Sequence, residues 1–118
     1  ANRISGFVNA PSLIQRVLKR TLGCRADFSV YEHNRALLLR ELPKMGYRLV
    51  KPEGAFYLLI QAPEGDDAAF AATLKEERIL TMPCKSFACP GYVRLATVRN
   101  ALPGFRRTAE SYKAKGLL

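Results

Sequence analysis

Apolar residues recur at helical spacing in the first third of the chain. The stretch after Asn9 places apolar side chains at positions 13, 14, 17, 18 and 22, which predicts an amphipathic helix that ends at Gly23. Ser29 and Glu32 have the spacing of a capping box, so we expect a second helix to begin there. It should run to about residue 42, because Pro43 ends or kinks a helix.

Two further helices are predicted in the second half. Asp66 and Asp67 are capping residues in front of a helical run, although Glu76 and Glu77 near its end oppose the helix dipole. A leucine and a proline at 102–103 open the last helix, whose apolar face consists of Phe105, Ala109 and Tyr112.

Four segments rich in aliphatic and aromatic residues are predicted to be strands: 47–50, 55–61, 79–82 and 92–98. A short turn joins the first two, and a structured loop at 83–90 separates the last two. The elements then follow in the order helix, helix, strand, strand, helix, strand, strand, helix. This order predicts an α+β domain, in which a small antiparallel or mixed sheet carries helices packed on one face.

The composition indicates a single domain. With 118 residues, 48% of them hydrophobic, the chain is long enough to bury a core. It has neither an apolar run of membrane-spanning length nor a secretion signal, so we expect a cytoplasmic protein without a membrane partner. The cysteines Cys24, Cys84 and Cys89 are odd in number and lack CxxC spacing, which favours structural free thiols and no metal site.

The formal net charge of +9 raises the question of a nucleic-acid partner. Residues 1–25 carry five basic side chains and no acid, residues 99–118 carry five against one acid, and residues 26–98 are balanced. Because the excess lies on the two flanking segments, it favours solvated or subunit-facing helices over a continuous phosphate groove. We therefore expect no nucleic-acid partner.

Two segments could carry chemistry. Arg94 stands inside an apolar strand, and if it points to the core side its charge needs a planar anion such as a substrate carboxylate. Strand alternation could instead point it into water, or it could pair with an internal acid. Phe56 follows Gly54 and Ala55, where it could form the apolar wall of a ligand site or simply pack in the fold.

The chain by itself looks catalytically incomplete. Its lysines fall at helix or turn positions expected to be exposed, and nothing supports an activated Lys85 in the loop. A Ser/His/Asp triad would depend on the single histidine, His33, and the sequence has no GxSxG, HExxH or P-loop motif. We therefore assign no catalytic residue to this chain.

Three motifs in order resemble the small C-terminal domain of class I/II aminotransferases, the pyridoxal-phosphate-dependent enzymes of fold type I. They are KPEGAFYL at 51–58, ILTMP at 79–83 followed by Phe87, and PGYVRL at 90–95. Upstream, residues 6–11 and 15–17 resemble the segment that enters that domain. Residues 102–105 resemble a late helix start in one subgroup.

The resemblance implies roles for three residues. In that family the arginine of the matching strand grips the α-carboxylate of the amino-acid substrate, which would make Arg94 a substrate-binding residue. It also implies that Phe56 lies near the substrate and that Asn9 lies close to a neighbouring subunit's active site. The assignment needs a buried Arg94 guanidinium near the phenyl ring of Phe56.

The resemblance further implies a parent enzyme, a homodimer with bound pyridoxal phosphate, that moves an amino group between an amino acid and a 2-oxo acid. The lysine and the other groups that hold the cofactor belong to the family's large domain, whose motifs are absent here. Residues 1–10 would then be an entering segment and 11–118 the small domain of a fragment that is inactive and cofactor-free alone. Arg78, Cys84 and Ala88 stand where relatives usually have glycine.

Two other classes of function remain open. A basic ferredoxin-like module could bind RNA through its sheet, although such modules favour a basic residue and exposed aromatics around Gly54, where this chain has Glu53 and Ala55. A standalone regulatory domain that binds a small molecule would have the same fold and would need no lysine.

Overall fold

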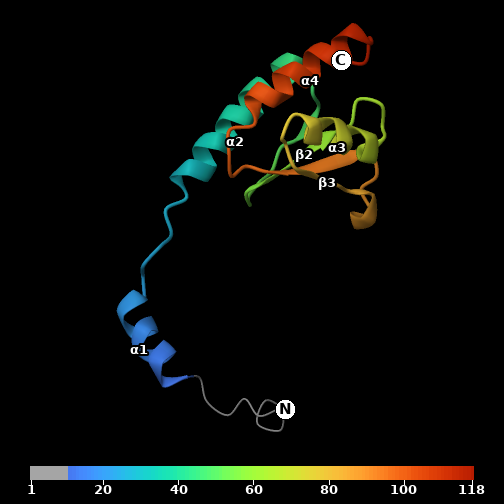
Figure 1. Ribbon diagram of the computed structural model, residues 1–118. Helices are drawn as coiled ribbons and strands as arrows, with labels where there is room; N and C mark the ends of the chain where they lie inside the picture. The colour runs from blue at the N-terminus through green and yellow to red at the C-terminus, as the bar shows by residue number, and fades with distance from the viewer. Residues whose placement is uncertain (1–10) are drawn as a thin grey trace.

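The computed structural model describes residues 11–118, and its elements follow the predicted order (Figure 1). The helices are α1 (Ser12–Thr21), α2 (Ser29–Glu41), α3 (Asp67–Glu76) and α4 (Leu102–Ala114). The strands are β1 (Leu49–Val50), β2 (Tyr57–Gln61), β3 (Thr81–Pro83) and β4 (Tyr92–Ala96). Two 3₁₀ turns, η1 (Pro43–Met45) and η2 (Lys85–Phe87), complete this part of the chain.

The strands pair antiparallel in the order β1-β2-β4-β3, so β4 lies between β2 and β3. Leu58 of β2 stands opposite Leu95 of β4, and both side chains are buried. Successive side chains on a strand point to opposite faces, so the neighbouring pair Leu59 and Arg94 lies on the other face. The sheet therefore has a core face and an open face.

Helices α2, α3 and α4 bury the core face. Their side chains and those of the strands form one hydrophobic core, whose largest fully buried members include Phe70, Phe105, Leu38, Leu42, Leu58, Ile60, Leu74 and Val93. Tyr47 joins this core and its hydroxyl donates a hydrogen bond to the carbonyl oxygen of Phe105 at 3.2 Å, while burial raises the pKa of that hydroxyl. The predicted α+β class, with helices packed on one face of a small antiparallel sheet, is confirmed.

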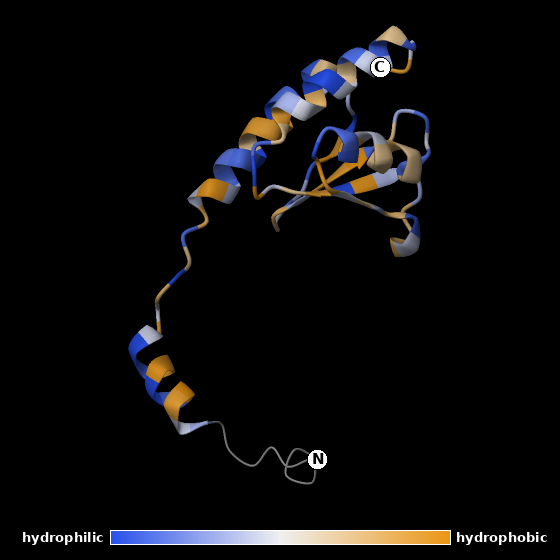
Figure 2. Cartoon of the chain, viewed as in Figure 1, coloured by the Kyte–Doolittle hydropathy of each residue, from blue (hydrophilic) through white to orange (hydrophobic). Residues whose placement is uncertain are grey.

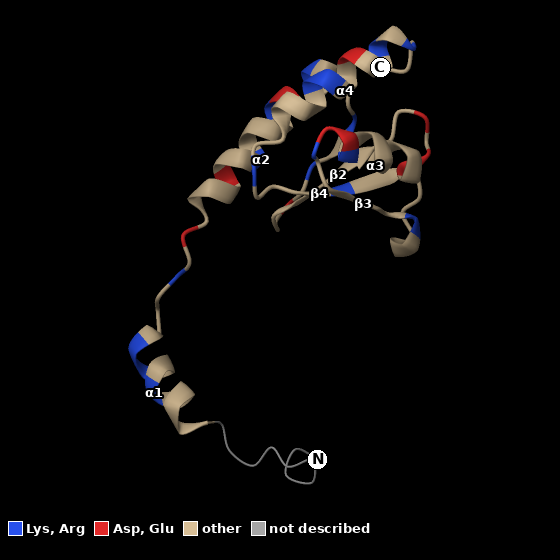
Figure 3. Cartoon of the chain, in the orientation of Figure 1, with Lys and Arg blue, Asp and Glu red and all other residues tan. Residues whose placement is uncertain are grey.

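Helix α1 stands apart from the rest of the described chain, to which residues 22–28 connect it (Figure 1). It has no buried residue, and its apolar stripe is uncovered in the described chain (Figure 2). The exposed apolar residues of this stripe are Leu13, Ile14, Val17, Leu18 and Leu22. Lys and Arg positions occur on α1 and on α4 (Figure 3), the two flanking segments that hold the charge excess.

The N-terminal cap predicted for α3 is confirmed, and the one predicted for α2 is wrong. Asp66 caps α3, since its carboxylate accepts hydrogen bonds from the backbone N–H groups of Ala68 and Ala69, both at 3.0 Å. The capping box predicted at Ser29 is wrong, because Ser29 is already the first residue of α2. Its N–H instead donates to the carboxylate of Asp27 at 2.9 Å, so the polar start signal lies two residues earlier.

The acidic end of α3 has a tertiary explanation. Glu77 is the residue that follows this helix, and its carboxylate pairs with the guanidinium of Arg107 on α4. An opposite charge from a neighbouring helix offsets the unfavourable dipole at that end. This contact joins residues 30 positions apart, so local sequence cannot reveal it.

Two positions where the family resemblance led us to expect glycine adopt the left-handed conformation here. Arg78, before β3, has φ 60°, and Ala88, after η2, has φ 56°. Side chains with a Cβ are disfavoured in this region because the Cβ approaches the backbone too closely. The backbone path typical of glycine is therefore retained without glycine.

We predict opposite effects for the same substitution at two exposed alanines. Ala88→Gly should raise the free energy of unfolding by about 1 kcal/mol, because glycine adopts positive φ without strain. Ala72→Gly, inside helix α3, should lower it by about 1 kcal/mol. Urea unfolding midpoints of the two variants check this, and a loss of stability in Ala88→Gly would contradict the strain at Ala88.

Candidate functional site

Arg94 lies in the middle of β4, on the open face of the sheet. Its side chain is half-buried, not buried as the sequence argument required. Strand alternation causes the difference, since the flanking Val93 and Leu95 take the core face. The guanidinium is thus partly shielded but accessible.

Two aromatic rings hold the Arg94 guanidinium. Its Cζ lies 4.5 Å from the ring centroid of Tyr57 and 5.0 Å from that of Phe87. Within residues 11–118 the ion pairs join Glu41 to two basic neighbours and Glu77 to Arg107, and none includes Arg94. The interpretation in which Arg94 pairs with an internal acid therefore finds no support.

Phe56 connects to Arg94 through Tyr57. The ring centroids of Phe56 and Tyr57 are 4.3 Å apart, and the Phe56 ring is 42% exposed. Tyr31 of α2 lies 5.8 Å from Phe56 on centroids, and Phe28 lies 6.4 Å from Tyr31. The rings form a row that leads from α2 to the arginine, so the two residues predicted together do belong to one region.

Buried polar groups fix the backbone at Phe56. The carbonyl oxygen of Phe56 accepts hydrogen bonds from the Thr97 backbone N–H at 2.8 Å and from the Thr97 hydroxyl at 3.1 Å. The side-chain amide of Asn34, on α2, donates to the Thr97 carbonyl oxygen at 3.1 Å. Thr97 and Asn34 are both buried, which makes these bonds costly to break.

A second set of bonds fixes the turn that carries Phe87. The buried carboxylate of Asp67, at the start of α3, accepts the Lys85 backbone N–H at 2.8 Å. The Cys84 backbone N–H donates to the Tyr92 carbonyl oxygen, and the Phe87 N–H donates to the Cys84 carbonyl oxygen, both at 2.9 Å. The turn that carries Phe87 is therefore tied to α3 and β4.

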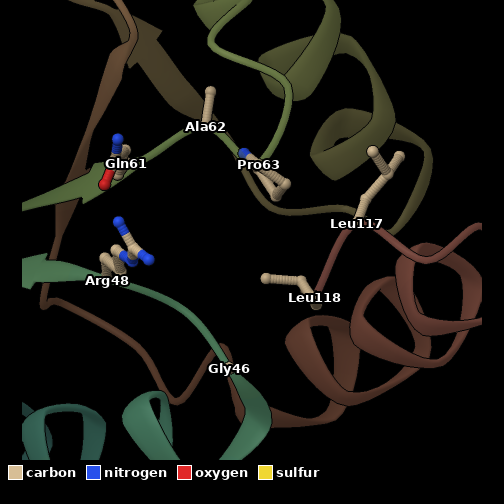
Figure 4. Close-up of a pocket in the computed structure, with 7 residues that line it drawn as sticks. All are labelled: Gly46, Arg48, Gln61, Ala62, Pro63, Leu117 and Leu118. Carbon is tan, nitrogen blue, oxygen red and sulfur yellow. The ribbon is translucent and has the colours of Figure 1, made fainter.

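Two of the surface hollows near the sheet can be compared with the predicted site residues. One, of about 340 Å³, borders Phe56 and is lined by Phe28, Tyr31, Glu32, Arg35, Ala55 and Phe56. The other lies between β1, the end of β2 and residues 117–118, and its side chains appear in Figure 4. Its lining includes Arg48 and Gln61 but neither Arg94 nor Phe56. Only the first hollow thus adjoins a residue predicted from the sequence.

The remaining predictions concern the position of Asn9, metal binding and a membrane span. Asn9 lies outside the described residues, so its place relative to Arg94 stays a prediction. The part of the chain from 11 to 118 contains no cluster of three or more His, Cys, Asp or Glu side chains able to hold a metal ion. Within the same residues, no helix is both long and apolar enough to cross a membrane.

Sequence reasoning missed Tyr57, Phe87 and Thr97. Tyr57 stands opposite Ala96, so it reaches Arg94 diagonally, and this neighbour depends on a strand order that the sequence did not predict. Phe87 belongs to a family motif, but its contact with Arg94 depends on the path of the loop. The contact of Thr97 is with a backbone carbonyl and has no sequence signal.

The family model for aminotransferase class I and II matches residues 2–101 of the chain. This match covers most of the sequence and includes the strand that carries Arg94. The chain therefore belongs to the class I and II aminotransferase family, as the sequence motifs indicated.

Curated relatives are aminotransferases. An aspartate aminotransferase of Thermotoga maritima is 39% identical over 67 residues, which cover 56% of this chain and 18% of the relative. An aspartate/prephenate aminotransferase of Thermus thermophilus is 37% identical over 65% of this chain and 22% of the relative. An aspartate aminotransferase of Thermococcus kodakarensis is 33% identical over 80% of this chain and 28% of the relative. The chain thus spans less than a third of the length of these relatives.

Solved structures agree on the fold. A Thermotoga maritima aspartate aminotransferase superposes with a TM-score of 0.60 at 30% identity, over 73% of this chain and 24% of that one. An aromatic aminotransferase from Pyrococcus horikoshii gives a TM-score of 0.67 at 24% identity, over 92% of this chain and 30% of that one. These matches do not favour the RNA-binding alternative.

The three cysteines differ in surroundings that determine thiol reactivity. Cys24 is exposed, Cys89 is half-buried, Cys84 is buried, and all three are free, so only Cys84 has the burial expected of a structural thiol. Burial raises the pKa of the Cys84 thiol, and the nearby Cys89 raises it further, although the positive charge of Arg94 acts in the opposite direction. Cys84 should therefore hold less of the reactive thiolate than an ordinary cysteine.

We predict that a thiol reagent at about pH 8 modifies Cys24 first and Cys84 last in the folded protein, with Cys84 at least about tenfold slower. Peptide mapping by mass spectrometry measures the three rates. In concentrated guanidinium chloride the rates should converge. Equal rates in the folded state would show that Cys84 is not protected.

Proposed function

We propose that this chain is the small domain of a pyridoxal-phosphate-dependent aminotransferase, and that Arg94 binds the α-carboxylate of its amino-acid substrate. The single observation that carries the proposal is the half-buried guanidinium of Arg94, stacked on aromatic rings and free of any ion pair among residues 11–118. Family membership supports it, because relatives are named as aminotransferases.

Arg94 suits a carboxylate for a chemical reason. A guanidinium offers N–H donors in a planar fork, which matches the two oxygens of a carboxylate. Rings that attract the cation through their π faces do not occupy its N–H donors as a carboxylate would. A substrate held there by two parallel bonds has a fixed orientation, which is the contribution this domain makes to the reaction.

Phe56 would then form an apolar wall beside the substrate. Phe56 is exposed and lines the hollow of about 340 Å³ beside α2. Its ring contacts that of Tyr57, and the Tyr57 ring contacts the Arg94 guanidinium. An apolar wall excludes water from the carboxylate contact and so strengthens it.

The remaining parts of the site would come from a cofactor-binding large domain. When bound, pyridoxal phosphate supplies the electron sink that allows removal of the substrate Cα proton. We assign none of its ligands to residues 11–118. The exposed apolar stripe of α1 supports a covering partner of this kind, since soluble proteins rarely leave such a patch open. We also propose a homodimer in which Asn9 lies near the other subunit's site.

We predict that Arg94→Lys in the intact enzyme lowers kcat/KM for amino-acid substrates by about a hundredfold. A lysine keeps the charge but cannot form the paired bonds, and loss of about 2.7 kcal/mol is typical of such charge-assisted contacts. Steady-state transamination with a panel of amino-acid donors and 2-oxo-acid acceptors measures the effect.

Arg99→Lys is the matched control, because Arg99 is an exposed arginine just beyond the same strand. It should keep kcat/KM within about twofold, as surface substitutions usually do. Unchanged kinetics in Arg94→Lys would remove this arginine from the site. Absence of transamination by the unmodified enzyme would reject the proposed function itself.

A further inference from the structure

The two rings beside Arg94 come from different parts of the fold. Tyr57 belongs to β2, the strand paired with β4, and Phe87 belongs to η2, in the connection between β3 and β4. The guanidinium thus contacts one ring from a neighbouring strand and one from a loop. A side chain with four rotatable bonds thereby loses most of its alternative positions.

Aromatic rings restrain a guanidinium without neutralising it. A carboxylate partner would occupy the N–H donors and cancel the charge, whereas a ring attracts the cation through its π face. Arg94 makes no ion pair within residues 11–118, so its charge and its donors stay available. The rings can therefore orient the Arg94 guanidinium while its N–H donors stay available for a carboxylate.

The backbone that carries the two rings is itself held by the fold. Tyr57 packs against Phe56, whose backbone carbonyl is fixed by Thr97. The turn that carries Phe87 is tied to α3 by the Asp67 carboxylate, which accepts the Lys85 N–H. Such second contacts are what keep a binding group in one orientation.

We propose that Tyr57 and Phe87 are positioning residues, which hold the Arg94 guanidinium in the plane that receives the substrate carboxylate. This inference rests on the proposed function. It adds that carboxylate affinity depends on two rings that make no hydrogen bond to the substrate.

The test compares ring-removing and ring-keeping variants of the intact enzyme. Tyr57→Leu and Phe87→Leu should each raise KM for the amino acid about tenfold and change kcat less than about twofold, because the carboxylate contact exists before and during the reaction. Tyr57→Phe and Phe87→Tyr keep a ring and should restore KM to within about twofold of the unmodified enzyme.

Tyr92→Leu is the matched control. Tyr92 is a half-buried tyrosine on the same face of β4, and it makes no cation–π contact with Arg94. Its replacement should leave KM within about twofold. A general loosening of the sheet would instead raise KM in all three leucine variants alike.

A double-mutant cycle gives the decisive readout. In an Arg94→Lys background, Tyr57→Leu and Phe87→Leu should add less than about twofold to KM, because the group they position is gone. The inference would be overturned if KM were unchanged in the single ring variants. It would also be overturned if the ring variants raised KM tenfold in the Arg94→Lys background as well. Either result would leave the proposed function intact. Absence of transamination in the unmodified enzyme would overturn both.

Discussion

The antiparallel pairing of β2 with β4 is the constraint on which the rest of the site depends. Leu58 and Leu95 meet on the buried face, and this contact fixes the register of the two strands. A shift of one residue would send Arg94 into the core and Leu95 to the surface, at a high cost in free energy. The packing of the core therefore decides that the arginine stands on the open face, beside Tyr57.

The open face explains how the fold tolerates an unneutralised cation at the centre of a sheet. A guanidinium in the core would require a buried carboxylate, and the pair would be unable to bind anything else. On the open face, water reaches part of the side chain and two rings stabilise the rest. The charge is thus kept available at a modest energetic cost.

Sequence patterns predicted the element order, the α+β class and the cap at Asp66, because these depend on local periodicity and local hydrogen bonds. They also placed Arg94 on a strand, and Tyr57 links it to Phe56. They failed at Ser29, where the neighbouring Asp27 offers a competing acceptor. The contact of the Phe87 ring with Arg94 depends on the path of the loop between β3 and β4, and the bond from the Lys85 N–H to Asp67 joins residues 18 positions apart, so neither follows from a local pattern.

The turn after Phe87 shows how stability and site geometry interact. Ala88 adopts a left-handed conformation directly after the residue whose ring contacts Arg94. A glycine there would relieve the strain but would also admit many more backbone conformations. An alanine stores some strain and limits the turn to fewer conformations, so the Phe87 ring is held more narrowly. Where a loop must position an aromatic side chain, the less stable residue can therefore be the better one for binding.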